Sequence, residues 1–414
     1  MIGLMDCNNF FVSCERLFRP DLAKKPLAVL SSNDGCIVAR SQEIKDLGIP
    51  MGVPYFQVKD ICTKAGAVLF SSNFTLYRDI STRIMKTLAE EVGKCDIYSI
   101  DEAFFEVPND ITEEEVLKLR AQIMQNVGLP VSIGIASTKT LAKQASSMAK
   151  KENGACILTQ ELWAEKAICT GCGSVWGMGK QTVSKLKELG VSTAAEFMRL
   201  DRTVIRSHFG VQGDRIYSEL QGVSVYSLGQ NSVDIQKSIM STRSFEKTTK
   251  KCSDIESAIG YHISFVAEKL REKKLVASRI YVLMQASRHS DFSFRTGSAE
   301  VVLDIPTSHT DILLKQALKV VRELFDAEVP YKKAGVVLGG LMPESYITNT
   351  LFETALSEDS EKSIDVITDA LNEKFGSGTI RSGVILQSGG RGSAQLRSKE
   401  YTTSWKDIPI VHTK

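Results

Sequence analysis

The order of apolar runs in residues 1–151 restricts the possible folds of this chain more than any other feature. Residues 1–7 and 130–137 are apolar runs typical of buried strands, and residues 95–107 hold two such runs in succession. Stretches with the apolar spacing of helices separate these runs, at 8–20, 73–92, 112–126 and 138–151. This order predicts an α+β fold with a β-α-β-β-α-β core and an insertion after its first helix.

Three carboxylates are expected at one end of the predicted sheet. Asp101 and Glu102 lie between the two strand-like runs of 95–107, and Asp6 ends the first run of the chain. If these strands lie at the centre of the sheet, the acids become neighbours. Together with the Cys7 carbonyl oxygen they are hard ligands, which suit Mg²⁺ better than zinc. Two such ions about 3.5–4 Å apart clamp the attacking and leaving oxygens of a phosphoryl transfer. Three solvated turn acids are the alternative that the spacing leaves open.

Two lysines and an arginine are candidates for binding a triphosphate that faces these acids. Lys45 is predicted on a short helix after a hairpin at 26–40, and Lys143 on the helix at 138–151. Either ammonium group could neutralise phosphate oxygens, and so could Arg40, just before the short helix. A solvated helix face is the competing interpretation for each of these residues.

Two adjacent aromatic residues, Phe10 and Phe11, follow Asp6 by about one helical turn. Both are candidate nucleotide-binding residues, although packing of the helix on the core is the favoured interpretation for Phe10. Phe11 would lie beside any sugar bound at the metal ions, where an aromatic ring blocks a 2′-hydroxyl group.

A turn with two glycines stands out in residues 152–230, which predict a small all-helical module. Gly177, Gly179 and Lys180 form this turn just before a helix. Glycines let backbone N–H groups approach a phosphate, and the start of a helix favours negative charge. The turn therefore indicates contact with a nucleic-acid backbone.

Residues 241–341 again alternate between strand and helix patterns and predict a second α+β domain. Clusters of basic residues, among them Arg243 and Lys247, fit contact with a phosphate backbone without reading of bases. A solvated face is the competing view.

Composition excludes several classes of protein. A net charge of +2 excludes a strongly basic tail-type binder, so any affinity for nucleic acid must come from local patches. No apolar run reaches the ~18 residues of a membrane span, and no signal peptide is visible. The nine cysteines are scattered, as in a reducing cytosol, so we expect a cytoplasmic protein without membrane contacts.

Six motifs follow one another along nearly the whole chain. They are MDCNNFFVSCERLFRPDL, SSNDGCIVARSQEIKDLGIPMGVPYF, SSNFTLYRD, YSIDEAF, GIASTKTLAKQASSMAKK and VWGMGK. Together they resemble the Y-family translesion DNA polymerases, and most closely the UmuC branch. The resemblance implies a right-hand polymerase with a palm at 1–25 and 75–165, fingers at 26–74, a helix-hairpin-helix thumb at 166–230, a DNA-binding little finger at 240–345 and a UmuC-type tail at 346–414.

The resemblance also implies roles for individual residues. The ligands of two catalytic Mg²⁺ ions would be Asp6, the Cys7 carbonyl, Asp101 and Glu102. Phe11 takes the steric-gate position that rejects ribonucleotides, where many relatives have tyrosine. Lys45 and Lys143 match positions that bind the triphosphate. The turn from Gly177 to Gly179 resembles the thumb's contact with the DNA backbone.

The end of the chain resembles a tail that relatives outside the UmuC branch lack. DALNEKFGSGTIRSG and YTTSWKDIP carry this likeness, which implies association with a UmuD′-like dimer and regulation through a RecA filament. Residues 348–352 look like a sliding-clamp peptide with Leu351 and Phe352 as its apolar anchor. Because the last 40 residues are rich in glycine and serine, we expect them to be loosely ordered or to fold on a partner.

The function implied by the resemblance is error-prone, template-directed DNA synthesis past lesions in the SOS DNA-damage response. The primer 3′-hydroxyl attacks the α-phosphate of a dNTP, and pyrophosphate leaves. Because the core starts at residue 1, we expect no proofreading domain. We also expect the enzyme in the bacterial cytoplasm, at the nucleoid when it is active.

Two alternatives remain beside this function. A two-metal nucleotidyl cyclase carries two glycines in its signature hairpin, and SIDEAF lacks them. An inactive scaffold that binds DNA or the clamp is the other, and the retention of three acids argues against it.

Overall fold

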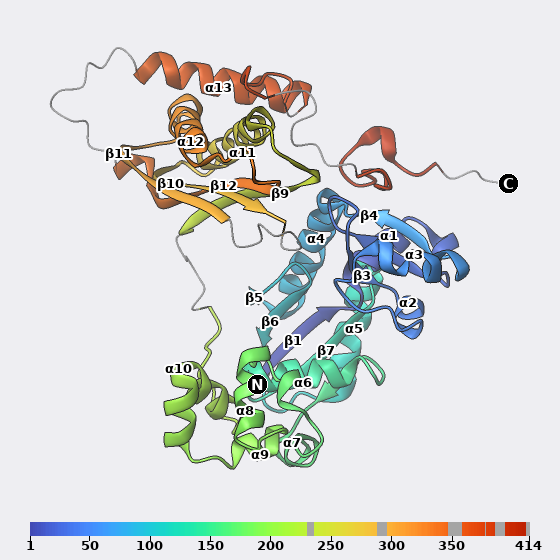
Figure 1. The fold of residues 1–414 in the computed structure, drawn as a ribbon. Coiled ribbons are helices and arrows are strands. Elements are labelled where there is room, and N and C mark those ends of the chain that lie inside the picture. The colour runs from blue at the N-terminus through green and yellow to red at the C-terminus, as the bar shows by residue number, and fades with distance from the viewer. Residues whose placement is uncertain (230–235, 288–295, 347–357, 377, 386–393, 411–414) are drawn as a thin grey trace. The chain divides into compact units, whose positions relative to one another are not determined.

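The computed structural model describes residues 1–229, 236–287, 296–346, 358–376, 378–385 and 394–410. Contacts divide the chain into two compact units, Met1–Ser232 with Ala394–Lys414, and Val233–Ser393. Figure 1 colours the first unit blue to green, with the last described residues in red. The end of the chain therefore returns to the unit that holds its beginning.

A five-stranded sheet forms the centre of the first unit, in the order β5-β6-β1-β7-β8. Its strands are β1 (Ile2–Cys7), β5 (Cys95–Ile97), β6 (Glu102–Glu106), β7 (Val131–Ala136) and β8 (Ala155–Ile157). β1 runs antiparallel to both β6 and β7, and β8 runs parallel to β7. The predicted β-α-β-β-α-β core is confirmed. The sequence allowed both hairpin strands to lie at the centre; β6 does, next to β1, whereas β5 lies at the edge.

Helices cover the two faces of this sheet. They are α1 (Phe10–Leu17), α4 (Phe74–Val92), α5 (Glu113–Val127) and α6 (Lys139–Ala149). The start of α5 is set by its local sequence, because the Thr112 hydroxyl accepts from the Glu115 N–H while the Glu115 carboxylate accepts from the Thr112 N–H. This capping box sets the start of the helix that the sequence predicts at 112–126.

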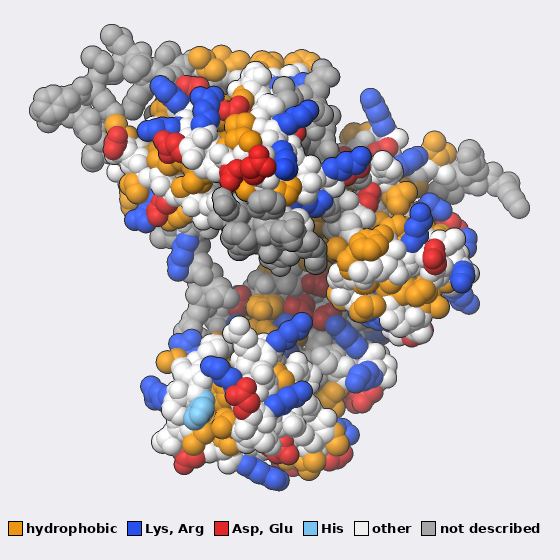
Figure 2. All heavy atoms as spheres, viewed as in Figure 1, with side chains coloured by type: hydrophobic (Ala, Val, Ile, Leu, Met, Phe, Trp, Pro, Cys, Tyr) orange, Lys and Arg blue, Asp and Glu red, His pale blue; other side chains and the backbone are white. Residues whose placement is uncertain are grey.

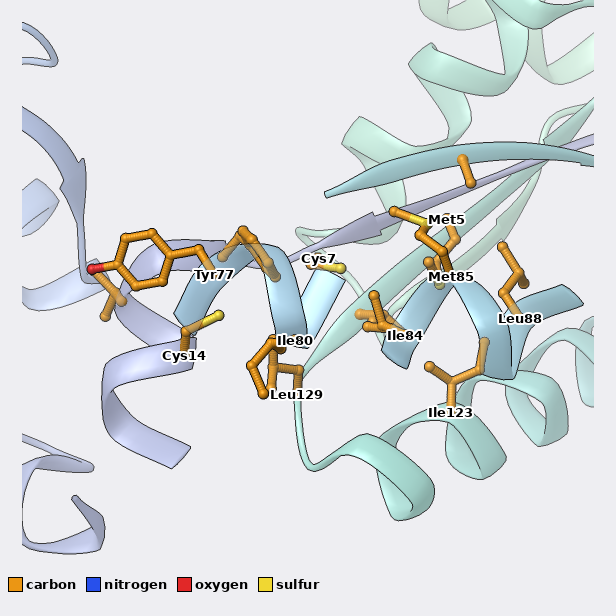
Figure 3. Close-up of a cluster of buried hydrophobic side chains, with 14 of the residues drawn as sticks. Met5, Cys7, Cys14, Tyr77, Ile80, Ile84, Met85, Leu88, Ile123 and Leu129 are labelled. Atoms are coloured by element: carbon orange, nitrogen blue, oxygen red, sulfur yellow. The ribbon is translucent and has the colours of Figure 1, made fainter. Parts of the chain in front are cut away.

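Side chains of β1 alternate between the two faces of the sheet, as a strand requires. Met5 and Cys7 join the core that α4 and α5 cover, which Figure 3 shows in close-up. Leu4 points to the other face and belongs to the core shared with α6. Asp6 is two residues from Leu4, so the strand directs its side chain to the face that carries α6.

The insertion between α1 and α4 forms a small sheet of its own, in the order β3-β2-β4. Its elements are η1 (Pro20–Leu22), β2 (Leu27–Leu30), β3 (Ile37–Arg40), α2 (Gln42–Asp46), α3 (Tyr55–Lys64) and β4 (Val68–Ser71). β2 and β3 are antiparallel and form the predicted hairpin, with Asp34 at a φ of 54° in its turn. β4 pairs in parallel with β2 and forms an edge of this sheet.

Helices follow β8, as predicted. They are α7 (Gln160–Ala167), η2 (Cys172–Ser174), α8 (Lys180–Glu188), α9 (Ala194–Met198) and α10 (Arg202–Leu220). Gly210 has a non-helical φ of 62°, so α10 consists of two helices joined at a turn. The buried carboxylate of Glu219 accepts from the Thr140 N–H of α6 at 3.0 Å and from the Val225 N–H at 2.7 Å. This carboxylate fastens the helical module to the central sheet.

The second unit is an antiparallel sheet in the order β11-β10-β12-β9, with helices packed on it (Figure 1). Its strands are β9 (Ser238–Thr249), β10 (Leu275–Ala286), β11 (Thr296–Thr307) and β12 (Tyr331–Pro343), and its helices are α11 (Cys252–Glu272), α12 (Thr310–Leu324), η3 (Glu344–Tyr346) and α13 (Glu358–Phe375). The predicted second α+β domain is confirmed. Arg271 of α11 pairs with Asp369 at 2.6 Å and holds α13 to this unit.

The glycine- and serine-rich end of the chain was expected to be loosely ordered or to fold on a partner, and its described parts contact the rest of the protein. Val384 and Ile385 lie close to Gly260, where a Cβ atom would come within 2.6 Å of Val384 Cγ1. Residues 394–410, which include η4 (Trp405–Asp407), contact the first unit. These contacts link residues hundreds of positions apart, so residue composition alone does not predict them.

Within the described ranges, the structure contains no helix that is both long enough and apolar enough to pass through a membrane.

Candidate active site

Two of the three predicted carboxylate ligands face each other across neighbouring strands. Asp6 of β1 and Glu102 of β6 are direct partners in the antiparallel ladder. Lys143 of α6 and Lys150, the residue that caps the end of α6, approach them, with Lys143 Nζ 2.9 Å from Glu102 Oε2 and Lys150 Nζ 2.6 Å from Asp6 Oδ2. The centre of the sheet therefore carries two carboxylates matched by two ammonium groups.

Burial changes the acidity of this site. The pKa of Asp6 rises to about 6 because the carboxyl group is buried, and the negative charge of Glu102 adds to the rise. The Lys150 ammonium opposes it by pairing with Asp6. Two carboxylates crowded into one buried place favour a cation between them. The donor set at this point consists of oxygens, which fits a hard ion such as Mg²⁺.

Asp101 stands beside this pair with a donor of its own. The Ser99 hydroxyl donates to Asp101 Oδ1 at 2.6 Å, and the Cys7 N–H donates to the Asp101 carbonyl at 2.9 Å. The second bond ties Asp101 to the end of β1. Among the described residues, no three acids, cysteines or histidines are grouped closely enough to hold a metal ion. Three carboxylates repel one another, and here each has its own partner in Lys150, Lys143 or Ser99.

The predicted triphosphate ligand Lys143 is enclosed. Its ammonium lies 4.4 Å from the centre of the Tyr98 ring and 5.5 Å from that of Trp176, besides pairing with Glu102. Trp176 donates from Nε1 to the Tyr98 hydroxyl at 3.1 Å. This cage holds Lys143 against Glu102 and leaves its side chain only 16% exposed.

Lys150 is a site residue that the sequence analysis missed. Its side chain is 40% exposed, so it is more accessible than Lys143 while pairing with Asp6. The signal was its position, because residues seven apart on a helix lie on the same face. The sequence analysis named only Lys143 from the predicted helix at 138–151.

Of the two other predicted cations, Lys45 lies close enough to Lys150 and Asp6 to feel their charges, and Arg40 lies near Lys45. Partial burial, with the positive charges of Arg40 and Lys150 nearby, lowers the pKa of Lys45. Lys45 donates to Asn9 Oδ1 at 2.7 Å, and Arg40 donates to the Ile49 carbonyl at 2.5 Å. Lys150 and Lys45 beside Asp6, with Arg40 next to Lys45, create a positive field that favours a polyphosphate.

The aromatic pair after β1 divides between core and site. Phe10 is buried in the hydrophobic core, as expected for a residue that packs the helix on the sheet. Its ring is therefore not exposed to contact a nucleotide directly. Phe11 is half-buried and stacks on Tyr77, with ring centres 4.4 Å apart and planes inclined by 14°. The Tyr77 hydroxyl donates to Glu15 Oε1 at 2.6 Å. Glu15 and Tyr77 lie within two of the motifs quoted above, MDCNNFFVSCERLFRPDL and SSNFTLYRD, but the sequence analysis gave neither of them a role.

Comparison with known proteins identifies the family. A model described as the impB/mucB/samB family matches residues 5–147, and that of its C-terminal domain matches residues 236–351. A domain of unknown function matches residues 363–411. The protein UmuC of Salmonella typhimurium is 33% identical over 99% of both chains. The chain belongs to the UmuC branch of the Y-family translesion DNA polymerases.

Other relatives agree with this assignment. A DNA polymerase IV of Bacillus velezensis is 25% identical over 92% of both chains. The solved structure of a chimeric Y-family DNA polymerase is similar in fold, with a TM-score of 0.69, 21% identity, and coverage of 83% of this chain and all of its own. This UmuC-branch chain is therefore a DNA-directed DNA polymerase with DNA and nucleotides as substrates. Its family uses divalent metal ions.

The glycine turn of this polymerase has two different halves. Gly177 has a φ of 88°, and a Cβ there would come within 2.9 Å of Ile216 Cδ1, so glycine is required for the fold. Gly179 has an ordinary φ of −75° and open space where a Cβ would stand. Lys180 begins α8 beside it and is exposed. The open half of the turn is thus the part accessible to a ligand.

The other predicted contact residues lie in or near the second unit. Arg243 and Lys247 are on β9, the edge strand of that sheet, and Lys247 is exposed while Arg243 is half-buried. Leu351 and Phe352, the predicted clamp anchor, lie outside the described residues.

Proposed function

We propose that this polymerase adds a nucleotide to a primer through the acid pair at the centre of its sheet. The primer 3′-hydroxyl attacks the α-phosphate of a dNTP opposite the template base, and pyrophosphate leaves. Asp6, Asp101 and Glu102, with the Cys7 carbonyl, are the candidate ligands of two Mg²⁺ ions. When bound, such ions lower the pKa of the attacking hydroxyl and neutralise charge on the leaving group.

The observation that carries this proposal is the opposed pair of Asp6 and Glu102 facing the cations of α6. A sheet centre places both carboxylates on a rigid support, as a reaction with two substrates requires. The field of the neighbouring lysines favours a triphosphate at the same place. Lys150 and Lys45 are the proposed triphosphate ligands, and Lys143 keeps Glu102 in position.

Phe11 is the proposed steric gate. Its ring lies one helical turn beyond Asp6, and Tyr77 supports it on one face. A ring fixed beside the sugar would leave no room for a 2′-hydroxyl. The enzyme would then insert deoxyribonucleotides in preference to ribonucleotides.

The domain assignment proposed for the chain is the right-hand division, with palm at 1–25 and 75–165, fingers at 26–74, thumb at 166–230 and little finger at 240–345. The thumb turn at Gly179 and the basic residues of β9 are proposed to contact the DNA backbone. Such contacts are independent of base identity, so they suit synthesis on a damaged template.

Protein partners are proposed for the tail at 346–414. Figure 2 shows hydrophobic side chains along α13, where Ile364, Val366 and Ile367 are 57–64% exposed. Exposed apolar side chains gathered on a helix support a protein partner there. A UmuD′-like dimer is the proposed partner, with control by a RecA filament and docking to a sliding clamp in the cytoplasm.

Primer extension across an abasic template site with Mg²⁺ tests the activity. Wild type should extend the primer when a UmuD′-like partner and activated RecA are supplied. Asp101→Asn should lower the rate by at least about a thousandfold and leave DNA binding nearly unchanged, because the charge acts on the reaction rather than on the duplex. Asp110→Asn, an exposed aspartate after β6, is the control and should match wild type. Normal extension by Asp101→Asn would remove Asp101 from the site.

A further inference from the structure

The last described segment, residues 394–410, lies against the edge strand β4 (Figure 1). We call it the C-terminal strap. The Ser71 N–H donates to the Leu396 carbonyl at 3.1 Å, and the Leu396 N–H donates to the Ser71 hydroxyl at 3.0 Å. Arg397 forms a parallel bridge with the same serine. The strap therefore pairs with the small sheet at its open edge.

The strap also holds the residue that begins α4. Asn73 is fully buried, and its side-chain amide donates to the Ser398 hydroxyl at 3.0 Å and to the Lys399 carbonyl at 3.2 Å. Its oxygen accepts from the Leu76 N–H, which caps the helix, and from Arg397 at 3.2 Å. One side chain thus links the strap to the start of α4, the helix that carries Tyr77.

A third contact reaches a buried carboxylate. The Ser398 hydroxyl donates to Glu15 Oε1 at 3.1 Å, and the Tyr77 hydroxyl donates to the same oxygen at 2.6 Å. Glu15 is fully buried on α1, and its other carboxylate oxygen has no hydrogen-bond partner in the described part of the chain. Burial raises the pKa of Glu15, and the two hydroxyl groups oppose this rise. The charged form of a buried carboxylate is strongly stabilised by each hydrogen-bond donor, because water is not there to replace a lost one.

Tyr77 connects this carboxylate to the site. Its hydroxyl end is anchored on Glu15, and its ring face supports the Phe11 ring at 4.4 Å. A contact chain therefore runs from Ser398 through Glu15 and Tyr77 to Phe11. Its first member comes from the strap, 383 residues from Glu15 in the sequence.

We infer that the C-terminal strap positions the Phe11 ring through Glu15 and Tyr77, and thereby sets how strictly the enzyme rejects ribonucleotides. This inference rests on the proposed gate role of Phe11. Ser398 is then a positioning residue, which acts on the sugar through other side chains. The strap lies within residues 363–411, which match a domain of unknown function, and the inference gives that part of the domain a role.

The test compares kcat/KM for a dNTP with that for the matching ribonucleotide, using the full chain and the same accessory proteins for every variant. Ser398→Ala should lower the sugar discrimination by about three- to tenfold while dNTP insertion stays within about twofold of wild type, because only the support of the gate is weakened. Ser398→Thr keeps the hydroxyl and should restore discrimination. Ser404→Ala removes a strap hydroxyl that has no hydrogen-bond partner in the described structure, and it should behave as wild type.

A second variant keeps the test open if Ser398→Ala does not fold. Tyr77→Phe retains the ring that stacks on Phe11 and removes only the hydroxyl bonded to Glu15, so it should lower discrimination to a similar extent. In a Phe11→Ala background, Ser398→Ala should have no further effect on discrimination, because the ring that the strap positions is gone.

The outcomes separate the two claims. Unchanged sugar discrimination in Phe11→Ala overturns the gate role and this inference with it. Lowered discrimination in Phe11→Ala, with Ser398→Ala and Tyr77→Phe both equal to Ser404→Ala, overturns the inference alone. An equal loss of dNTP and ribonucleotide insertion in Ser398→Ala would mean that the strap has only a structural role. That result also contradicts the inference.

Discussion

At the scale of single residues, the site depends on which face of the sheet each side chain of β1 and β6 points to. Asp6 and Glu102 share their faces with Leu4 and Phe104, which pack in the core shared with α6. The same alternation that buries Leu4 therefore turns Asp6 toward the lysines of α6. A shift by one residue in either strand would send its acid to the other face of the sheet.

Lys150 should be the most sensitive lysine of the triphosphate site. Lys150→Ala is expected to reduce kcat/KM for dNTP insertion by roughly 10- to 100-fold, mainly through KM, because an exposed ammonium beside Asp6 is lost. Lys150→Arg should keep part of the activity. Lys151→Ala, which alters the exposed neighbour, should have little effect in the same steady-state assay. Equal losses in Lys150→Ala and Lys151→Ala would refute the assignment.

The two glycines of the thumb turn should respond differently to alanine. Gly177→Ala is expected to cost about 1–3 kcal/mol of unfolding free energy, because φ is 88° and the new Cβ meets Ile216. Gly179→Ala should fold normally and weaken DNA binding several-fold, because its methyl group would stand where a phosphate approaches. Urea unfolding measures the stability of each variant, and a DNA titration at one salt concentration measures its affinity for DNA. Unaltered DNA affinity in Gly179→Ala would contradict the proposed contact.

At the scale of elements, α6 is the component on which the site is built, and a buried ion pair secures its beginning. Lys139, the first residue of α6, lies 2.7 Å from Asp96 of β5, and their side chains are only 6% and 9% exposed. Glu219 receives the Thr140 N–H one residue later. These contacts tie the start of α6 to an edge strand on one side and to the helical module on the other.

Loss of one partner of this ion pair should destabilise the first unit. Lys139→Met is expected to lower the free energy of unfolding by about 3–5 kcal/mol, because it leaves the Asp96 carboxylate buried without its partner. The double variant Lys139→Met with Asp96→Leu should recover part of that loss. Lys86→Met, which removes an exposed partner of Glu90, is the control and should change little. A double variant less stable than Lys139→Met would argue against this account.

At the scale of the whole molecule, the chain forms two units with separate cores, so the stability of each unit can depend differently on pH. His262 of α11 gives the second unit a titrating group in its interior. The ring is buried and shares a 2.8 Å contact with the Ser241 hydroxyl of β9. Burial lowers the pKa of His262 to about 4, and the charge of Arg243 adds to this effect.

The second unit should therefore lose stability in mild acid. The unfolded chain takes up a proton near pH 6.5, whereas folded His262 stays neutral to about pH 4. The contribution of neutral His262 to the free energy of unfolding is fully present above pH 6.5. It falls by roughly 3 kcal/mol as the pH drops toward 4, and this group causes no further loss below that pH. Hydrogen exchange of β10 and β12 amides at several pH values measures it. His262→Asn should flatten the dependence, and the same slope in that variant would exclude His262 as the cause.

Local signals allowed much of the fold to be predicted. The Thr112–Glu115 capping box, the hairpin turn around Asp34 and the continuous apolar runs of β1 and β7 all act within a few residues, so the sequence shows them directly. The position of β5 at the sheet edge and the burial of Glu219 depend on pairing and packing between distant segments. No local sequence pattern indicates the edge position of β5 or the burial of Glu219.

By itself the sequence determined the order of the elements, the family, and the chemistry of a site with oxygen donors and lysines. Only the tertiary structure decided that Lys150 meets Asp6, that Tyr98 and Trp176 enclose Lys143, and that the strap reaches Glu15. The physical reason is that periodicity and capping are set by near neighbours along the chain. Pairing of charges and the return of a distant segment are set by packing in three dimensions, where donors compete for the same buried carboxylate.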